Sequence, residues 1–266
     1  MIGFGIAGNF AHHLEQAGES ADFVDVVVDD VDAPKGIFPT YVPKQKGFLG
    51  TYPFSSDKIA FVAGKNLQVE PEVGLLCEVL YHDSVIEKLL PTHFMAYNDC
   101  SIRVEGAKKI SHKKNWGADS KGVSATHITI DKFSAGGVMD GYSLVSYIRR
   151  DGKLVQYGEN SELLGYSYFY ERLSSWMVEK LNAQKDTGPL EDLHGLILAA
   201  GKPEKMLISI GATRYTEFGE KHYLQKGDEL FVVVYPHALY GQEDIVIMIE
   251  EGRFKEGVSA LCQEVI

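Results

Sequence analysis

Cysteine is scarce in this 266-residue chain, which contains only Cys77, Cys100 and Cys262. Three widely spaced cysteines do not supply a disulfide framework, so the sequence favours a reducing compartment. The N-terminus lacks the basic segment of a secretory signal. No apolar run approaches the roughly 20 residues that are needed to span a bilayer. We therefore expect a cytoplasmic protein that makes no contact with a membrane.

Positive charge is also in short supply, because the formal net charge is −11. A phosphate backbone would be repelled by such a field, and no basic stripe stands out along the chain. The densest basic cluster comprises Lys108, Lys109, Lys113 and Lys114. A short charge run of this kind indicates a solvated loop, so we predict that the protein does not bind nucleic acid.

Helical periodicity is limited to three segments, at residues 9–18, 168–184 and 191–200. Alternating apolar residues and β-branched runs dominate the rest of the chain. They predict strands at residues 22–28, 66–80, 93–98, 124–131, 142–149, 206–211, 229–235 and 243–250. We found no Pro/Gly/Ser linker that would divide the chain. The pattern predicts a β-rich α+β fold in one domain that spans residues 1–266.

The predicted strand at residues 66–80 contains two acidic residues at alternate positions. Side chains alternate between the faces of a strand, so Glu70 and Glu72 project from the same face, roughly 7 Å apart. Two close carboxylates repel each other when both are ionised, and a hard cation such as Mg²⁺ removes that repulsion. Taken alone, the pair also fits a solvated strand face. Pro71 lies between them and cannot donate to a sheet, so it indicates an edge, a bulge or an unpaired position.

The N-terminus contains a G-x-G-x-x-G pattern formed by Gly3, Gly5 and Gly8, with Asp29 21 residues further on. This spacing is typical of a dinucleotide-binding fingerprint and keeps an NAD-binding oxidoreductase as a remote alternative. The fingerprint requires a strand before its first glycine, whereas only Met1 and Ile2 precede Gly3. The β-rich pattern that follows also differs from the alternating helices and strands of that fold.

The order of several motifs resembles the fumarylacetoacetate hydrolase superfamily along most of the chain. The motifs are GNFAHH at 8–13, FLGTYPFSSDKI at 48–59, VEPEVGL at 69–75, YNDCSIR at 97–103, DSKG at 119–122, DGKLVQYGENSELL at 151–164, ISIGAT at 208–213 and LQKGDEL at 224–230. None of them is specific alone, but their common order is. The resemblance implies a mixed β-sandwich or β-roll of the C-terminal domain type of that family, in a homodimer.

The resemblance also implies a site for Mg²⁺, Mn²⁺ or Ca²⁺ and chemistry on a small 2-oxo or 1,3-dicarbonyl acid. Its metal ligands would be Glu70, Glu72 and Asp99, at a site open to solvent on one side. Lys121 stands where the active-site lysine does. Residues that contact the substrate in relatives correspond to Arg103, Gln156 and Thr213. The reaction would be C–C bond hydrolysis, decarboxylation or tautomerisation through a metal-chelated enolate, as in a hydrolase, lyase or isomerase.

The chain departs from the family where relatives carry a His-x-x-Glu pair that activates water. Aligned on Asn9, the histidine is His13 and its partner is Gln16; shifted by one residue, His12 pairs with Glu15. Both pairings lie on one face of a helix, so His12, His13 and Glu15 all remain catalytic candidates. A non-catalytic metal- or ligand-binding protein on the same fold is the main alternative, since a branch without a working base would show the same motifs.

Overall fold

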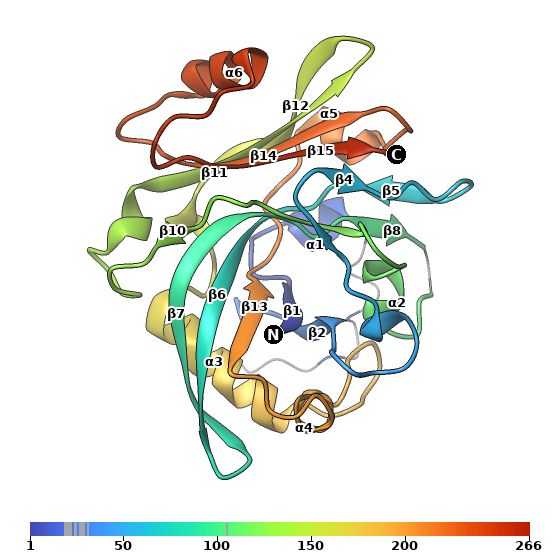
Figure 1. Cartoon of the computed structure of the whole chain (residues 1–266), viewed down its shortest axis with the longest axis vertical. Coiled ribbons are helices and arrows are strands. Elements are labelled where there is room, and N and C mark those ends of the chain that lie inside the picture. Colours follow the sequence, from blue (N-terminus) through green and yellow to red (C-terminus); the bar gives the residue numbers. More distant parts are fainter. Residues whose placement is uncertain (19–22, 24–25, 27–29, 31, 105) are drawn as a thin grey trace.

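The computed structural model describes residues 1–18, 23, 26, 30, 32–104 and 106–266. Within them, the strands form two large curled sheets and one small pair, with short helices on the outside (Figure 1). The expectation of a β-rich α+β fold is thereby confirmed. None of the described helices has the length and apolar character required to cross a membrane.

The larger sheet contains eight strands within the described residues, in the order β2-β1-β13-β6-β7-β9-β3, and β10 also pairs with β7. Its strands are β1 (Ile2–Ala7), β2 (Gly36–Tyr41), β3 (Phe54–Ser55), β6 (Pro71–His82), β7 (Val85–Asn98), β9 (Lys121–Val123), β10 (Ile128–Thr129) and β13 (Lys205–Ser209). The long β6–β7 hairpin is its centre. Its open end, where β6 begins and β7 finishes, brings Pro71 opposite Asn98 and Glu72 opposite Tyr97.

The second sheet has the order β12-β11-β14-β15-β4. Its strands are β4 (Lys58–Ile59), β11 (Tyr142–Arg150), β12 (Lys153–Glu162), β14 (Glu229–Pro236) and β15 (Ser259–Val265). Alternate residues of β11 serve two cores: Leu144 and Ile148 belong to the main core that the two sheets share, whereas Val145 and Tyr147 pack outward. A third, two-stranded sheet joins β5 (Asn66–Gln68) to β8 (Ser101–Arg103).

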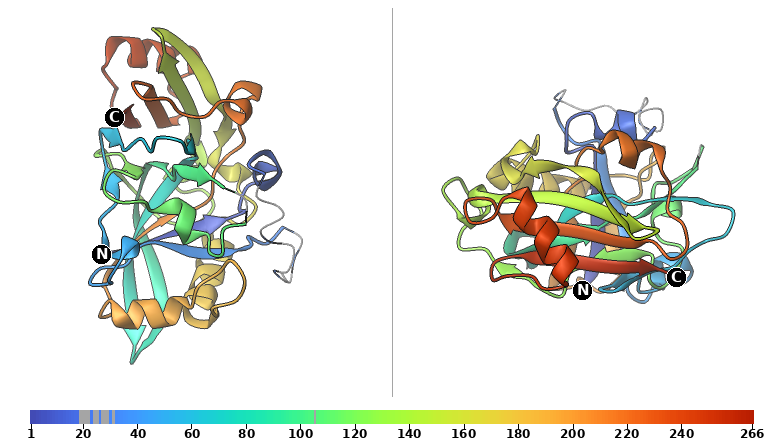
Figure 2. Two further views of the ribbon diagram at one scale, coloured as in Figure 1. Left: turned by 90° about the vertical axis from the view of Figure 1, so that its right-hand side faces the viewer. Right: turned by 90° about the horizontal axis from the view of Figure 1, so that it is seen from above.

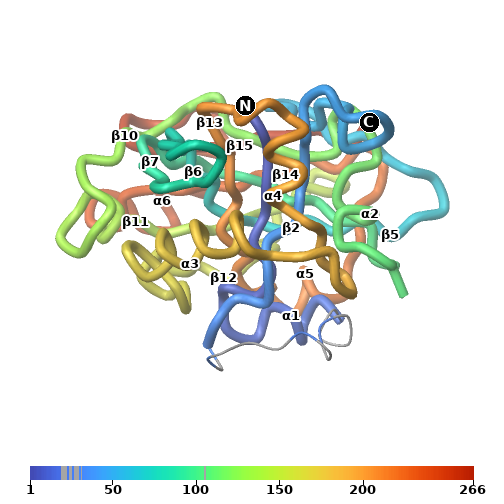
Figure 3. The backbone as a smooth tube through the Cα atoms, turned by 90° about the horizontal axis from the view of Figure 1, so that it is seen from below, coloured from blue at the N-terminus to red at the C-terminus, as the bar shows by residue number. Residues whose placement is uncertain are grey.

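The helices lie at the periphery of the sheets. The longest are α3 (Tyr170–Ala183) and α6 (Gln242–Glu251), and the shorter ones are α1 (His13–Gln16), α2 (Ser111–Lys114), α4 (Leu193–Ala199) and α5 (Glu217–Lys221). The view from below shows α3 and α4 side by side across one end of the larger sheet (Figure 3). At the opposite end of the molecule, α6 covers the outer face of the second sheet (Figure 2).

Most predicted elements are present, and two were wrong. Residues 243–250 were predicted as a strand but form α6, because Ile245, Met248 and Ile249 pack at helical spacing on Val145 and Val233. Gly252, at φ 63°, ends this helix in the left-handed conformation. Residues 124–131 were also predicted as a strand, yet only Ile128–Thr129 pair, against β7. Most of the predicted strand at 22–28 lies outside the described residues.

The N-terminal glycines have a packing role that differs from a dinucleotide fingerprint. Gly3 and Gly5 lie within β1 itself, and no loop separates them from the strand. A Cβ atom at Gly5 would lie 2.4 Å from the Phe38 ring, and one at Gly3 would lie 2.7 Å from Thr40 Oγ1. The two glycines are therefore explained by the close approach of β2, and the NAD-binding alternative loses its motif.

Candidate metal centre

Three buried carboxylates meet at the open end of the β6–β7 hairpin. Glu70 directly precedes β6, Glu72 is its second residue, and Asp99 follows the last residue of β7. The Asp99 amide donates to the Glu70 carbonyl at 3.0 Å, which fixes the two chain segments side by side. Each of the three residues offers a carboxylate oxygen, and these oxygens all lie within 4.8 Å of one another. The residues that the resemblance assigned to a metal are thus brought together.

Pro71 occupies a position that requires no hydrogen-bond donor from the backbone. It is the first residue of β6, one of the places in a sheet that tolerates proline. The strand predicted over 66–80 is accordingly broken into β5 and β6, with Val69 and Glu70 between them. The Glu70 amide donates to the Asn98 side chain at 3.2 Å instead of to a strand neighbour. The break lets Glu70 turn toward Asp99.

Lys121 also lies at this centre, as expected. It begins β9, which pairs with β7 at the position of Asn98. Its side chain is fully buried; the ammonium lies 3.2 Å from Asp99 Oδ1 and donates to the Cys100 carbonyl. The Trp116 ring covers it, with the ammonium 5.4 Å from the ring centroid. This ammonium is held against a metal-ligand candidate and shielded from water.

Arg103 contacts a carboxylate of the site directly. Its guanidinium lies 2.8 Å from Glu70 Oε1 and also donates to Gln68 Oε1 at 2.6 Å and to the Tyr215 hydroxyl at 2.9 Å. The expected substrate-binding arginine is therefore engaged with the protein itself. Its position at the end of β8 explains this, because β8 pairs with β5 just before Glu70.

Lys114 was missed by sequence reasoning. The basic cluster at 108–114 was predicted to be a solvated loop, which is wrong for Lys113 and Lys114, each only 2% exposed. The Lys114 ammonium lies 2.6 Å from Glu70 Oε2 and 2.6 Å from Asp99 Oδ2. The same ammonium lies over the Phe38 ring, 5.1 Å from the ring centroid. The charge run itself does not indicate that Lys114 is buried, because its partners Glu70 and Asp99 are distant in sequence.

Burial and neighbouring charges set the pKa values of the three carboxyl groups apart. Burial alone would raise the pKa of Glu70, but the charges of Lys114 and Arg103 outweigh it and hold that pKa well below its ordinary value. Burial raises the pKa of Glu72 well above its ordinary value, and the negative charges of Asp99 and Glu70 add to this. The Glu72 carboxylate accepts a hydrogen bond from the Gly211 amide at 2.9 Å. Glu72 is therefore the group whose charge is stabilised least.

Lys114 and Lys121 oppose the effect of burial on the pKa of Asp99. Burial raises the pKa of this carboxyl group, while Lys114 and Lys121 partly offset the effect. Burial likewise lowers the pKa of Lys121, and Asp99 opposes that shift. Three carboxylates and the cations of Lys114, Lys121 and Arg103 form one compact cluster of opposite charges. A hard divalent cation fits the donor set, since such ions prefer several carboxylate oxygens.

The structure places His13, rather than His12, beside the carboxylates. His13 is 4% exposed, its ring centroid lies 5.1 Å from that of Tyr215, and its charge influences the pKa of Glu70. Gln16 exchanges hydrogen bonds with the Tyr215 backbone. His12, at φ 66°, is exposed. Glu15 is also exposed, so the His12–Glu15 pair lies on the outer side of α1.

Of the two remaining substrate-binding candidates, Thr213 lies beside the carboxylates, whereas Gln156 lies in the second sheet. Thr213 is 1% exposed, and its amide donates to the Pro71 carbonyl at 3.2 Å, between the two glutamates. Gln156 belongs to β12, and its side-chain amide donates to the Gly158 carbonyl at 3.0 Å. Neither arrangement tests the expected contact with substrate oxygens, which stays a prediction.

The site is enclosed and does not open to solvent on one side. A cavity of about 10 Å³ borders Glu70, Glu72, His13 and Lys114, which is room for about one water molecule. A second cavity of about 200 Å³ lies outside it and is lined by His12, Glu15 and Lys35, among others. Gly8 and Leu14 line both cavities. They therefore form part of the wall between the site and the outside.

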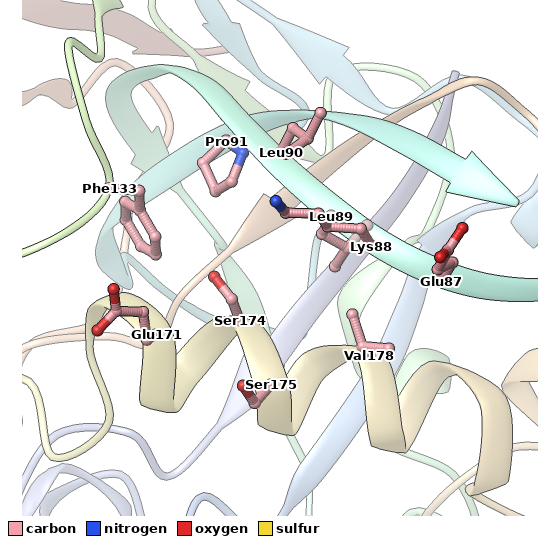
Figure 4. Close-up of a pocket in the computed structure, with 10 residues that line it drawn as sticks. All are labelled: Glu87, Lys88, Leu89, Leu90, Pro91, Phe133, Glu171, Ser174, Ser175 and Val178. Carbon is pink, nitrogen blue, oxygen red and sulfur yellow. The ribbon is translucent and has the colours of Figure 1, made fainter.

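A larger hollow of about 570 Å³ lies elsewhere, between β7 and α3 (Figure 4). Its lining includes Lys88, Pro91, Phe133, Ser174 and Val178. The lining residues come from β7, from α3 and, with Phe133, from the segment that follows β10, and its ionisable residues Glu87, Lys88 and Glu171 are all exposed. Size alone therefore does not make it a second reaction centre, and the buried charges remain the candidate site.

Several solved structures share this fold. A 2-keto-3-deoxyarabinonate dehydratase has a TM-score of 0.56 at 14% identity, over 99% of this chain and 72% of its own. A 5-carboxymethyl-2-hydroxymuconate delta-isomerase from Mycobacterium smegmatis has a TM-score of 0.55 at 12% identity, covering 100% and 78%. A provisionally named fumarylacetoacetate isomerase/hydrolase from Oleispira antarctica has a TM-score of 0.57 at 10% identity, covering 100% and 93%.

These likenesses show that the chain has the fold of the fumarylacetoacetate hydrolase superfamily, as its motif order indicated. No curated protein sequence matches it. A family model does match, over residues 19–265, and it carries the description "Family of unknown function (DUF5718)". That match covers nearly the whole chain, so the protein belongs to the DUF5718 family.

Proposed function

We propose that the protein is a divalent-metal-dependent enzyme that acts on a small 2-oxo or 1,3-dicarbonyl acid. The observation that carries the proposal is the convergence of Glu70, Glu72 and Asp99 within 4.8 Å, in a buried site with Lys121 against Asp99. The solved structures with this fold include a 2-keto-3-deoxyarabinonate dehydratase and a 5-carboxymethyl-2-hydroxymuconate delta-isomerase. The reaction would be cleavage, decarboxylation or tautomerisation next to a carbonyl group.

Glu70, Glu72 and Asp99 would hold the metal ion, which we expect to be Mg²⁺, with Mn²⁺ or Ca²⁺ as substitutes. When bound, the ion would supply Lewis-acid polarisation of a chelated carbonyl. Lys121 would place its ammonium beside the oxygen on which negative charge develops. The dry surroundings of Lys121 strengthen that interaction, because the ammonium lies under Trp116 and away from water.

We assign the proton transfer to His13. It is the histidine on the inner side of α1, next to Tyr215 and within electrostatic reach of Glu70. Gln16, three residues on, is bonded to the Tyr215 backbone and fixes the orientation of the helix. A substrate would reach this group from the outer cavity if α1 and the connection that precedes it moved, because Gly8 and Leu14 lie between the two cavities.

Turnover tests the proposal. Purified protein is incubated with Mg²⁺ or Mn²⁺ and either oxaloacetate or an acylpyruvate, and consumption of the oxo acid is followed by absorbance. We expect metal-dependent turnover that Lys121→Ala abolishes. Lys65→Ala, which removes an exposed lysine, is the control and should retain the wild-type rate. Absence of turnover with every metal and both acids would reject the enzymatic proposal.

A non-catalytic metal- or ligand-binding protein is the second candidate, and the enclosed cavity of about 10 Å³ is the observation that favours it. Such a protein would gain thermal stability with Mg²⁺ and oxalate, because binding to the native state raises the unfolding midpoint. It would consume neither acid. A homodimer and a cytoplasmic location also remain proposals, and light scattering of the purified protein tests the first.

A further inference from the structure

The Lys114 ammonium lies where two of the three carboxylates converge. It is 2.6 Å from Glu70 Oε2 and 2.6 Å from Asp99 Oδ2, and its side chain is only 3% exposed. The carboxylate oxygens of the triad lie within 4.8 Å of one another, a span that one cation can bridge. The cation that bridges Glu70 and Asp99 in this structure is a side chain of the protein itself.

We propose that Lys114 is a built-in cation of the carboxylate cluster, and that a divalent metal ion binds Glu70 and Asp99 only by displacing the Lys114 ammonium. The inference rests on the metal ligands named under the proposed function and adds a residue that controls their occupancy. An ammonium and a divalent ion bound to the same carboxylate oxygens would repel each other strongly in a buried site. The two cations therefore do not share these oxygens.

The backbone around Lys114 is fixed, so displacement is a movement of the side chain. Asn115, which follows α2, donates from its side chain to the carbonyls of Thr40 at 2.8 Å and Thr51 at 3.1 Å. At the other end of the helix, the Ile110 amide donates to the Pro189 carbonyl at 3.1 Å. The four-carbon stem of a lysine is flexible and can swing its ammonium away without moving these anchors.

Lys121 provides the contrast within the same cluster. Its ammonium approaches Asp99 Oδ1 at 3.2 Å and donates to the Cys100 carbonyl, so it borders the cluster at one carboxylate. Lys114 instead bridges two carboxylates. Removing either lysine takes one positive charge from the site, but only removal of Lys114 vacates the bridging position.

A consequence is that the protein folds without metal. Glu70 has both Lys114 and Arg103 as cationic partners, so its buried charge is compensated before any ion binds. A buried carboxylate without such a partner would be strongly destabilising. The built-in cation therefore stabilises the metal-free protein and lowers its affinity for metal.

Mn²⁺ binding to metal-stripped protein tests the proposal, with free Mn²⁺ measured by its electron paramagnetic resonance signal. We expect Lys114→Met to bind Mn²⁺ at least about tenfold more tightly than the wild type, because the competing charge is gone. The matched control Lys121→Met should tighten Mn²⁺ binding clearly less than Lys114→Met does, since it removes one neighbouring positive charge but leaves the bridging ammonium in place. Equal affinity of wild type and Lys114→Met, or an equal gain in both variants, would overturn the proposal.

Thermal unfolding provides the second readout and guards against a variant that folds poorly. Without metal, Lys114→Met and the milder Lys114→Gln should unfold at lower temperature than the wild type, and Mn²⁺ should restore them. If neither variant folds with or without Mn²⁺, the carboxylates do not exchange one cation for another and the proposal fails.

Failure of this inference is distinguishable from failure of the proposed function. Metal-dependent turnover by a wild type that binds Mn²⁺ as tightly as Lys114→Met would keep the enzyme and reject the displacement. Tight Mn²⁺ binding by Lys114→Met alone, without turnover of any oxo acid by either protein, would support the displacement and reject the enzyme.

Discussion

Arg103 and Glu70 form an ion pair with 2.8 Å between Nη1 and Oε1, and their side chains are only 8% and 4% exposed. The pair connects the small β5–β8 sheet to the carboxylate cluster, since Arg103 ends β8 and Glu70 precedes β6. Arg103 also donates to Gln68 Oε1 and to the Tyr215 hydroxyl. One guanidinium thus joins Gln68 and Glu70, which are neighbours in the chain, to the distant Tyr215.

Replacement of Arg103 by methionine should destabilise the protein by about 3–5 kcal/mol, because it leaves a buried carboxylate short of one partner. Urea unfolding measures the change. Arg149→Met is the control, since Arg149 pairs with Glu229 and Glu250, whose side chains are 49% and 55% exposed. Such surface pairs contribute about 1 kcal/mol or less. Equal losses in the two variants would contradict the assigned role of Arg103.

Glu72→Gln should separate metal binding from folding. The pKa of Glu72 is raised by burial and by Asp99 and Glu70, so the folded protein disfavours its charge. A neutral amide of the same shape should leave the metal-free unfolding midpoint unchanged or higher. The affinity for Mn²⁺ should fall by at least the roughly 10- to 100-fold that loss of an outer-shell partner costs. An unchanged Mn²⁺ response in this variant would remove Glu72 from the ligand set.

The sequence was most informative where a local pattern decided the outcome. Alternation predicted β11 and β14 closely, and the E-x-E spacing placed Glu70 and Glu72 in one cluster even though the strand breaks between Gln68 and Pro71. The motif order further assigned Asp99 and Lys121, which do lie at this cluster. These residues follow or begin strands of the same sheet, so their proximity depends on topology that the resemblance supplied.

Residues whose surroundings come from distant segments were the ones that could not be predicted. In the sequence, Lys114 looks like part of a solvated charge run. It is buried because it forms ion pairs with Glu70 and Asp99, which are distant in sequence and which the fold brings next to it. Helix α6 was mistaken for a strand because an apolar run such as Ile245–Ile249 suits either element until its packing face is known. The choice between His12 and His13 likewise required the orientation of α1.

Glu191 should make the stability of the protein fall as the pH rises from about 4.5 to about 7. Burial raises the pKa of its carboxyl group from 4.5 to about 7, despite the opposing effects of Ser111 and Lys109. Between these two pH values the folded protein binds the proton more tightly than the unfolded chain does. The free energy of unfolding therefore decreases with pH across this window, by on the order of 3 kcal/mol in total, and is constant with respect to this group outside it.

Urea unfolding of wild type and Glu191→Gln at several pH values between 4 and 8 measures this effect. The amide cannot titrate, so the difference in unfolding free energy between the two proteins should change steadily across the window, with the variant gaining relative stability as the pH rises. Two parallel curves would show that the Glu191 carboxyl group is not raised in the folded state.

His13→Asn and His12→Asn form a matched pair, because the two residues are adjacent yet lie on opposite sides of α1. His13 is buried against Tyr215, near Glu70, whereas His12 is exposed at the outer cavity. If His13 moves the proton in the proposed reaction, its loss should reduce kcat by roughly 10²- to 10⁴-fold, the usual range for a general acid or base. The His12 variant should lose far less, since water already reaches that side chain.

Steady-state rates with the oxo acid that the wild type consumes, together with melting curves of both variants, provide the measurement. A larger loss in His12→Asn would instead favour the His12–Glu15 pair and would require α1 to turn its outer face toward the carboxylates during turnover.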